Sequence, residues 1–411
     1  MKYVNIHTDN ERRNPMKKII SILVAVAMLF STFAISISAK ESEPSLRFND
    51  DGKFRILQMA DLQDNSVLNP VVKDFIKAAI KKTQPDLIVL TGDNFAGYAT
   101  GTNVSHSIDK SLAKKAINEY MSIFEKYGIP VTMVPGNHDD DDIKLTKEEE
   151  LDMYQKYDCF IGYDDVPEMY GCGTHNLPIY SSKNAYKLAY NLWMFDSNTY
   201  DEELGGYDYV HDDQVEWYVN KSNELKAANG GQSVPSMAFQ HIIVKEIFNT
   251  LVECPEGTPN SMPHDGKYYK FNDDYYESGN FKEWPCPGTR DSRQFSAMVE
   301  QGDVVAMFFG HDHNNSFEIN YKGIDLVATP GFTFASYSNE DRSFRVIDID
   351  ENDTSTYETS LIKWQDVYGS SKMAMNHYNM YAKENSGWVK FISAIKYIPF
   401  AILKVFFGYI F

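Results

Sequence analysis

The stretch FRILQMADLQDN, Phe54 to Asn65, contains the first strand that the sequence predicts, together with a polar turn after it. Residues 55–60 read as a short apolar strand, after which Asp61 and Gln63 enter a polar turn. An Asp that follows a buried strand is a common metal ligand, and its usual partner two residues on is His. The presence of Gln63 leaves two interpretations open: a metal site with a changed ligand, or a strand end that only resembles one.

The same alternation of strand and helix continues along the chain. The apolar spacing predicts helices over 71–83 and 110–128 and strands over 85–93 and 129–139. Further on, it predicts antiparallel strands over 176–198, a helix over 212–229, and strands over 233–241, 303–313, 316–332 and 343–350. This rhythm indicates an α/β domain with partly parallel strands. Residues 252–292 lack periodicity and are expected to form a long surface loop or lid.

Composition limits the class of partner. The 411 residues are 43% hydrophobic and 24% charged, which is ordinary for a globular protein. The net charge of −19 argues against nucleic acid, because no basic surplus exists to neutralise phosphates. A phosphorylated substrate remains compatible, since bound metal ions would reverse the local potential.

The N-terminus predicts export. Lys17 and Lys18 precede an apolar run that ends at Ala39, and Met16 is a plausible start of the chain. A basic flank, an apolar core and a small-residue exit are typical of a secretory signal. An uncleaved membrane anchor is the alternative, so the protein is expected to be secreted or attached to the cell surface. An oxidising compartment would permit disulfides among the cysteines, which are Cys159, Cys172, Cys254 and Cys286.

The C-terminal tail, residues 387–411, is strongly apolar but carries spaced lysines and Pro399. Internal charges weaken a transmembrane interpretation. An interfacial helix with lysines reaching the headgroups fits better, and a helix packed on the protein's own body is the alternative. We therefore divide the chain into an N-terminal extension and signal (1–39), a main α/β domain (40–360), a helical or linker segment (361–386) and the tail (387–411).

Five predicted strands end in residues that bind metal ions well, and open α/β sheets place ligand sites at such ends. These residues are Asp61 with Gln63, Asp93, Asn137 with His138, His241, and His311 with His313. The mixture of carboxylates, amide oxygens and imidazoles suits divalent ions. It exceeds the needs of one ion and suggests two ions, bridged by one carboxylate.

In order, the motifs DLQ, GD, GNHD, a single His and GHDH resemble the signature of the calcineurin-like metallophosphoesterase superfamily. The resemblance covers residues 54–349. GHDHNNSF, GTHNLPI and NLWMFDSN are most similar to its purple-acid-phosphatase-like branch, which includes Dcr-type phosphatases. The resemblance implies an α/β fold, a four-layer α/β/β/α sandwich with two mixed sheets.

The resemblance also implies roles for matching residues. The first metal ion would be held by Asp61, Gln63, Asp93 and His313. The second would be held by Asp93, Asn137, His241 and His311, which makes Asp93 the bridge. A hydroxide between the ions would attack phosphorus, with Asp93, Asn137 and His138 as catalytic residues. His138, together with Asn137, would contact the substrate and stabilise its charge or protonate the leaving oxygen.

Other polar residues near these motifs have open roles. Asp139 would either orient the His138 imidazole or be a solvated turn residue. His175 lies near a loop that could border the substrate, and His264 lies in the long loop.

Two positions depart from the family pattern. Gln63 stands where most members have His, and its amide oxygen is a harder and weaker donor than imidazole. It should favour Mn²⁺, Mg²⁺ or Fe²⁺ over Zn²⁺, with Mn²⁺ first. Ala96 stands where purple acid phosphatases carry a metal-bound tyrosine, so a tyrosinate-bound ferric site is not expected.

The sequence thus predicts an exported enzyme with two divalent metal ions that hydrolyses phosphomonoesters of small molecules or phosphoproteins. Phosphodiester or nucleotide-diphosphate hydrolysis is the first alternative, because loops around the metals set selectivity. A non-catalytic surface-binding protein on the same scaffold is an alternative of another class.

Overall fold

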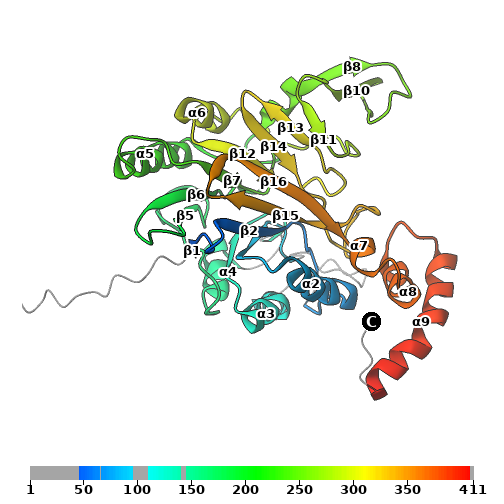
Figure 1. Cartoon of the computed structure of the whole chain (residues 1–411). Helices are drawn as coiled ribbons and strands as arrows, with labels where there is room; N and C mark the ends of the chain where they lie inside the picture. The colour runs from blue at the N-terminus through cyan, green and yellow to red at the C-terminus, as the bar shows by residue number, and fades with distance from the viewer. Residues whose placement is uncertain (1–45, 65, 96–109, 140–144, 408–411) are drawn as a thin grey trace, which may run out of the picture. The chain divides into compact units, whose positions relative to one another are not determined.

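The computed structural model describes residues 46–64, 66–95, 110–139 and 145–407. The expected signal segment and Ala96 lie outside these residues. The described chain contains two large mixed sheets, a small third sheet and helices on the outer faces (Figure 1).

The five-stranded sheet begins with the stretch that opened the sequence. Its order is β16 (Asp353–Lys363), β15 (Ser343–Asp350), β2 (Lys53–Met59), β3 (Leu87–Thr91) and β4 (Val131–Val134). β2, β3 and β4 are parallel, whereas β15 and β16 are antiparallel to their neighbours. The carboxyl ends of the three parallel strands therefore meet at one edge of this sheet.

The eight-stranded sheet supplies the rest of the strands predicted to carry ligands. Its order is β1 (Leu46–Arg47), β5 (His175–Tyr180), β6 (Leu188–Met194), β7 (Ser236–Phe239), β12 (Val304–Phe309), β14 (Ile324–Ala328), β13 (Glu318–Tyr321) and β11 (Tyr276–Ser278). β6, β7, β12 and β14 are parallel to one another. Both large sheets are mixed, as predicted.

Helices cover the outer face of each sheet. Against the five-stranded sheet pack α2 (Pro70–Thr83), α3 (Lys110–Tyr127), α4 (Lys147–Tyr154), α7 (Trp364–Tyr368) and α8 (Lys372–Tyr381). Against the eight-stranded sheet pack α5 (Asp212–Ala228), α6 (Gln294–Gln301) and the 3₁₀-helix η1 (Lys245–Thr250). The start of α2 shows how sequence sets these bounds: Asn69 caps it by accepting from the Val71 amide, and Pro70 occupies the first helical position.

Three hydrophobic cores separate these layers. One lies between the two large sheets and includes Ile56 and Val89 facing Phe239 and Phe308. The other two lie between each sheet and its own helices. Helix, sheet, sheet and helix follow one another, so the predicted four-layer α/β/β/α sandwich is confirmed.

The segment 252–292 differs from the expected long loop. It contains β8 (Leu251–Cys254), β9 (Met262–His264) and β10 (Lys267–Phe271), which form a small antiparallel sheet, and β11, which joins the large one. These strands are three to five residues long and mostly half-buried or exposed. They therefore lack the apolar alternation by which a strand is recognised in sequence.

The C-terminal segment is integral to the domain up to α8. Trp364 and Tyr378 lie in the same core as β2 and β3, so residues 364–381 are packed helices and not a linker. The last helix, α9 (Gly387–Phe407), packs on α8. Within the described ranges, no helix combines the length and apolarity needed to cross a membrane. All four cysteines are free thiols in this structure.

Candidate metal centre

The seven predicted ligands converge at one edge of the sandwich. Asp61, Gln63, Asp93 and Asn137 follow β2, β3 and β4 of the five-stranded sheet, whereas His241, His311 and His313 follow β7 and β12 of the other sheet. All seven side chains are buried. Backbone hydrogen bonds hold the strand ends together: the Gln63 amide donates to the Asp93 carbonyl at 2.9 Å.

The Asp93 carboxylate lies between two groups of donors. Its Oδ2 accepts from Gln63 Nε2 at 2.8 Å on one side. On the other side, its Oδ1 lies 3.3 Å from His241 Nε2 and accepts from the backbone amide of His138 at 2.8 Å. A carboxylate with one oxygen toward each group has the arrangement that bridging requires.

The first group joins Asp93 with Asp61, Gln63 and His313. Ligand atoms of Asp61, Asp93 and His313 all lie within 4.8 Å of one another. His313 Nδ1 lies 2.6 Å from the Tyr337 carbonyl oxygen, so this nitrogen carries the ring proton. The other ring nitrogen, Nε2, lies 3.3 Å from Asp61 Oδ1 and has the lone pair that can bind a metal ion. Gln63 Oε1 is buried, and no donor within the described ranges bonds to it. Buried oxygen and nitrogen atoms with free lone pairs, such as these, are the ligands that a divalent cation binds.

The second group joins Asp93 with Asn137, His241 and His311. His241 Nδ1 lies 2.9 Å from the Thr91 carbonyl oxygen and carries the ring proton. In the neutral ring, the Nε2 lone pair then faces the lone pairs of Asn137 Oδ1 at 3.2 Å, and His311 Nδ1 lies 3.3 Å away. Lone pairs that face one another need a positive charge between them, so this donor set also fits a metal ion.

The pKa values of the histidines likewise show that positive charge is favoured at this site. Burial disfavours charged His241, but the adjacent Asp93 carboxylate outweighs burial and raises the His241 pKa to about 10. Burial likewise opposes charge on His313, whose pKa is nevertheless raised by Asp61. Burial and the nearby charge of His241 lower the pKa of His311. The carboxylates thus stabilise a cation at the positions where the imidazole nitrogens converge.

The backbone at the ligand positions is unusual. Among the described residues, nine that are not glycine have a positive φ, and four of these are the ligand candidates Asp61, Gln63, Asp93 and His311. Such conformations cost free energy for side-chain-bearing residues and cluster at functional sites. The strand ends are therefore shaped for the site and not for regular pairing.

The glycines of the motifs are required chiefly for space. A Cβ on Gly136 would lie 2.2 Å from the Asp93 nitrogen, and one on Gly92 would lie 2.4 Å from His241 Nδ1. Gly92 also has a φ of +81°, a backbone conformation that favours glycine, whereas Gly136 does not have a positive φ. The close approach of the strand ends, and not a left-handed backbone conformation, therefore explains why the GNHD motif begins with glycine.

Asp139 has neither of the two expected roles. It is buried and accepts hydrogen bonds from the backbone amides of Asn94 at 2.7 Å, Gly136 at 2.8 Å and Phe95 at 3.2 Å. The carboxylate thus joins the loop after β3 to the loop after β4. Burial and the charge of Asp93 raise its pKa to about 7.

The remaining predicted histidines differ in exposure. His138 is half-buried, unlike its buried neighbours, as a residue that meets substrate must be. The expected substrate contact by His175 is corrected: its ring is fully buried, with Nε2 2.9 Å from Thr132 Oγ1 and Nδ1 2.8 Å from the Gly173 carbonyl oxygen. His264, in β9, stacks on Trp284 at a centroid distance of 3.8 Å.

Three tyrosines that the sequence alone did not identify as site residues lie next to the ligands. Tyr200 Oη accepts from Asn137 Nδ2 at 3.1 Å, which turns the amide oxygen of Asn137 toward His241. The ring of Tyr207 meets His311 edge-on at 4.3 Å, and the ring of Tyr337 stacks on His313 at 4.1 Å. They come from loops without periodicity, so only the assembled structure reveals them.

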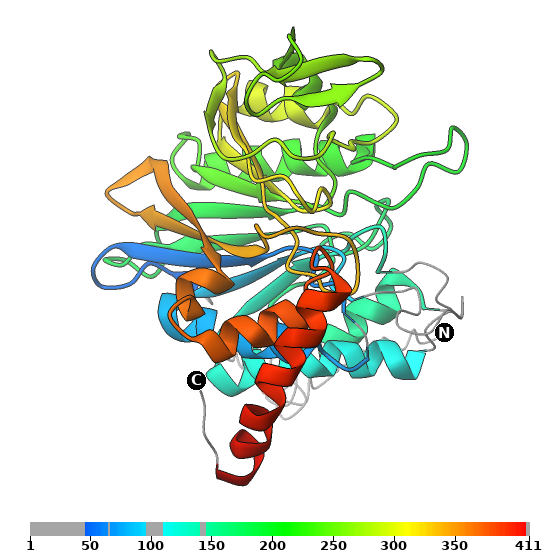
Figure 2. The same ribbon diagram turned by 90° about the vertical axis from the view of Figure 1, so that its right-hand side faces the viewer.

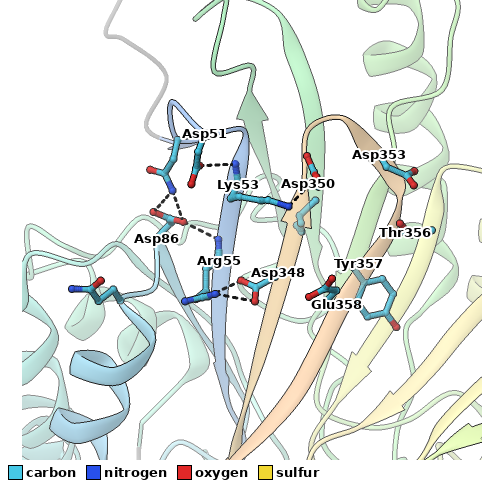
Figure 3. A pocket seen from close by; sticks show the side chains of 13 residues that line it. Asp51, Lys53, Arg55, Asp86, Asp348, Asp350, Asp353, Thr356, Tyr357 and Glu358 are labelled. Carbon is cyan, nitrogen blue, oxygen red and sulfur yellow. Dashed lines mark hydrogen bonds and ion pairs between the residues drawn. The ribbon is translucent and has the colours of Figure 1, made fainter.

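Two of the hollows lie near functional elements, and one of them is lined by residues next to the ligand His313. Asn314, next to the ligand His313, and Tyr337 both line a hollow of about 880 Å³. A second hollow, of about 450 Å³, lies at the opposite, amino ends of β2 and β3 (Figure 3). Its charges pair with one another, as Arg55 does with Asp348 at 2.6 Å, so it has the character of an ion-paired surface.

Comparison with known proteins decides the family. The sequence model described as calcineurin-like phosphoesterase matches residues 54–315. The chain belongs to this family. A relative named probable inactive purple acid phosphatase 29, from Arabidopsis thaliana, is 27% identical over 84% of this chain and 88% of its own length. Phosphatase DCR2 of Saccharomyces cerevisiae is 24% identical over 82% of this chain and 57% of its own length.

A solved structure of a dimetal phosphatase from Danio rerio covers 75% of this chain and 98% of its own chain, with 12% identity and a TM-score of 0.46. The resemblance inferred from the motifs is confirmed by the family match, and the calcineurin-like phosphoesterase described here is a metal-dependent phosphoester hydrolase. Dinuclear metal sites are typical of this family, and the two donor groups around Asp93 match that property.

Proposed function

We propose that this chain is an exported, dinuclear metal-dependent phosphatase that hydrolyses phosphomonoesters. The observation that carries the proposal is the position of Asp93, whose two oxygens lie between two separate groups of buried donors. A site for one ion would not need both groups.

The residues have distinct parts in this proposal. Asp61, Gln63 and His313 would hold one divalent ion with Asp93, and Asn137, His241 and His311 would hold the other. Ions bound there supply an ionised water as nucleophile near neutral pH and screen the charge of the phosphate. His138, half-buried beside Asn137, would stabilise the phosphoryl group or give a proton to the leaving oxygen.

The hollow beside His313 supports a polar leaving group. Its lining is rich in hydrogen-bonding side chains, among them Asn260, Asn280, Asn314 and Lys282. Such a surface suits the alcohol part of a small hydrophilic phosphomonoester or of a phosphoprotein better than an apolar group. A phosphodiester or a nucleotide diphosphate is the alternative substrate for the same centre.

The choice of metal follows from Gln63. Its amide oxygen is buried, and its amide nitrogen lies 2.8 Å from Asp93 Oδ2. A neutral oxygen donor there favours Mn²⁺, Mg²⁺ or Fe²⁺ over Zn²⁺. We therefore include Mn²⁺ as the preferred ion in the proposal.

Export is proposed from the sequence of the first 39 residues, with its basic flank and apolar run. Mass spectrometry of the protein from an exporting host tests this. A mature N-terminus near Lys40 supports a cleaved signal, whereas an intact N-terminus in the membrane fraction supports an anchor. Intact protein in the cytoplasm contradicts export.

A substrate panel tests the activity. The purified full-length protein is assayed with a phosphomonoester, a phosphodiester and a nucleotide diphosphate, under Mn²⁺ and Zn²⁺ separately. The highest kcat/KM is expected for the monoester with Mn²⁺. Asp93→Asn should lower kcat/KM by about 10²-fold or more, because both donor groups lose their shared charge. Asp50→Asn, at an exposed carboxylate, is the matched control.

A non-catalytic protein on this scaffold is the second candidate, because several relatives carry the word inactive in their names. The full donor set around Asp93 and the half-buried His138 argue for catalysis. Metal analysis separates the two: about two ions per chain together with turnover supports the enzyme. A chain that takes up no metal, or that binds metal without turning over any compound of the panel, supports the second candidate.

A further inference from the structure

The last helix, α9, presents a continuous apolar surface to solvent. Side chains spaced by three or four residues lie on one side of a helix. The six that form this face, here called the α9 face, have exposed fractions of 51–75%: Trp388, Phe391, Ile395, Ile398, Ile402 and Phe406. A soluble domain rarely leaves so many large apolar side chains together in water.

The opposite side of the same helix is fixed to the domain. Ser393 and Tyr397 are buried, and the Tyr397 ring stacks on His377 of α8 at 4.3 Å. Figure 2 shows α8 and α9 side by side, with the end of α9 extending beyond α8. The helix therefore packs on the protein's own body with one side only, which leaves the α9 face available to a partner.

The charge of α9 is opposite to that of the chain. Residues 387–407 contain Lys390, Lys396 and Lys404 and no acidic residue, whereas the whole chain carries a net charge of −19. Lys396 is exposed and follows Ile395 of the α9 face. A locally basic, apolar helix on an acidic protein is complementary to a surface that is both apolar and anionic.

We propose that α9 docks the protein on an anionic lipid surface, with the α9 face inserted among the acyl chains and the lysines at the headgroups. The described helices are not long and apolar enough to span a bilayer, which agrees with a helix that lies on it. A second copy of the chain fits less well, because pairing through this face would bring two sets of lysines together.

The way α9 is connected determines how the proposal must be tested. Between α8 and α9, Glu384 pairs with buried Arg342 at 2.9 Å, and Lys383 donates to the Ala335 carbonyl. Residues 331–342 belong to the loop that places Tyr337 against His313. A truncation that removed Lys383 and Glu384 together with α9 would therefore disturb the metal centre, whereas substitutions confined to the α9 face leave these contacts in place.

The experiment uses the triple variant Phe391→Gln, Ile395→Gln and Ile398→Gln. Its matched control replaces Val67, Tyr186 and Leu204 by Gln, since these side chains are 62%, 71% and 60% exposed and lie outside α9. Each full-length chain carries a protease site after Ala39 and is cut after folding, so that the N-terminal apolar run does not contribute. Cosedimentation is measured with phosphatidylcholine vesicles, with and without phosphatidylglycerol.

The parent protein and the control should bind the phosphatidylglycerol vesicles, and the triple variant should bind at least about tenfold more weakly. Added salt should weaken the binding. Circular dichroism and metal content should be the same for all three proteins, which shows that the fold is kept.

Four outcomes overturn all or part of the proposal. The first is no vesicle binding by the parent, and the second is equal binding by the triple variant. The third is a parent that light scattering shows to be a dimer and that the triple substitution converts to a monomer, because the α9 face would then be covered by a second copy. Equal binding to neutral vesicles overturns the choice of an anionic surface.

Discussion

The buried His175 allows a quantitative prediction about pH. Its imidazole lies in β5 and reaches Thr132 of β4, so it joins the two large sheets. Burial lowers the His175 pKa from 6.5 to about 4, because the charged ring would lose its water. The folded protein therefore holds the neutral ring at pH values where an unfolded chain binds a proton.

The sign and size follow from linkage between proton binding and folding. Above pH 6.5 the ring is neutral in both states and the free energy of unfolding is unaffected. Below it, the unfolded state takes up the proton first, so stability falls as the pH falls toward 4. The cost for pKa values of 6.5 and about 4 is about 2 kcal/mol at pH 5 and about 3 kcal/mol once both states are protonated.

Urea unfolding at pH 7.5 and pH 5.0 measures this effect. The parent protein should lose about 2 kcal/mol more between the two pH values than His175→Gln does, since Gln does not titrate. Comparing the two differences removes the contribution of every other group. His175→Gln should also keep the KM of the parent at pH 7.5, because the ring does not reach the substrate.

The reasoning is wrong if the parent and His175→Gln lose stability equally on acidification. A raised KM in a variant with unchanged metal content would restore the substrate role expected from the sequence.

Three other substitutions test the metal centre. Gln63→His should shift selectivity toward Zn²⁺ by about tenfold, ~1.4 kcal/mol, in competition titrations, and an unchanged selectivity would show that Gln63 does not reach the ion. Gly136→Ala should reduce metal uptake and lower the free energy of unfolding by about 1–3 kcal/mol, because its Cβ would overlap the Asp93 nitrogen; parent-like urea unfolding would contradict this. Tyr200→Phe should weaken metal affinity by about 10- to 100-fold in calorimetry, since the Asn137 amide loses its orienting partner, and parent-like affinity would make that contact irrelevant.

The layers of the sandwich were predictable because their elements bury one regular face. α2 and α3 have apolar positions at helical spacing, and β3 is buried along its whole length. The short strands β8–β11 were not predictable, because their side chains are half-exposed and the partners that define them are distant in sequence.

The site was partly predictable for a similar reason. Asp61, Asp93 and His241 each end a strand whose burial is visible in sequence, and parallel strands bring such ends together. The true position of His175 depends on which sheets meet across the sandwich, and the role of Asp139 depends on the approach of two loops. Such contacts arise from packing and leave no local pattern.

The two donor groups draw on both large sheets, and this has a consequence for stability. Asp61, Asp93 and Asn137 extend from one sheet, whereas His241, His311 and His313 extend from the other. A cation that binds only this arrangement couples its own release to separation of the layers. At a free-ion concentration 100 times Kd, such coupling stabilises a fold by about 2.7 kcal/mol. The ions at this centre would therefore act as a cross-link between the two large sheets. Chelation would weaken the packing of one sheet on the other as well as stop turnover.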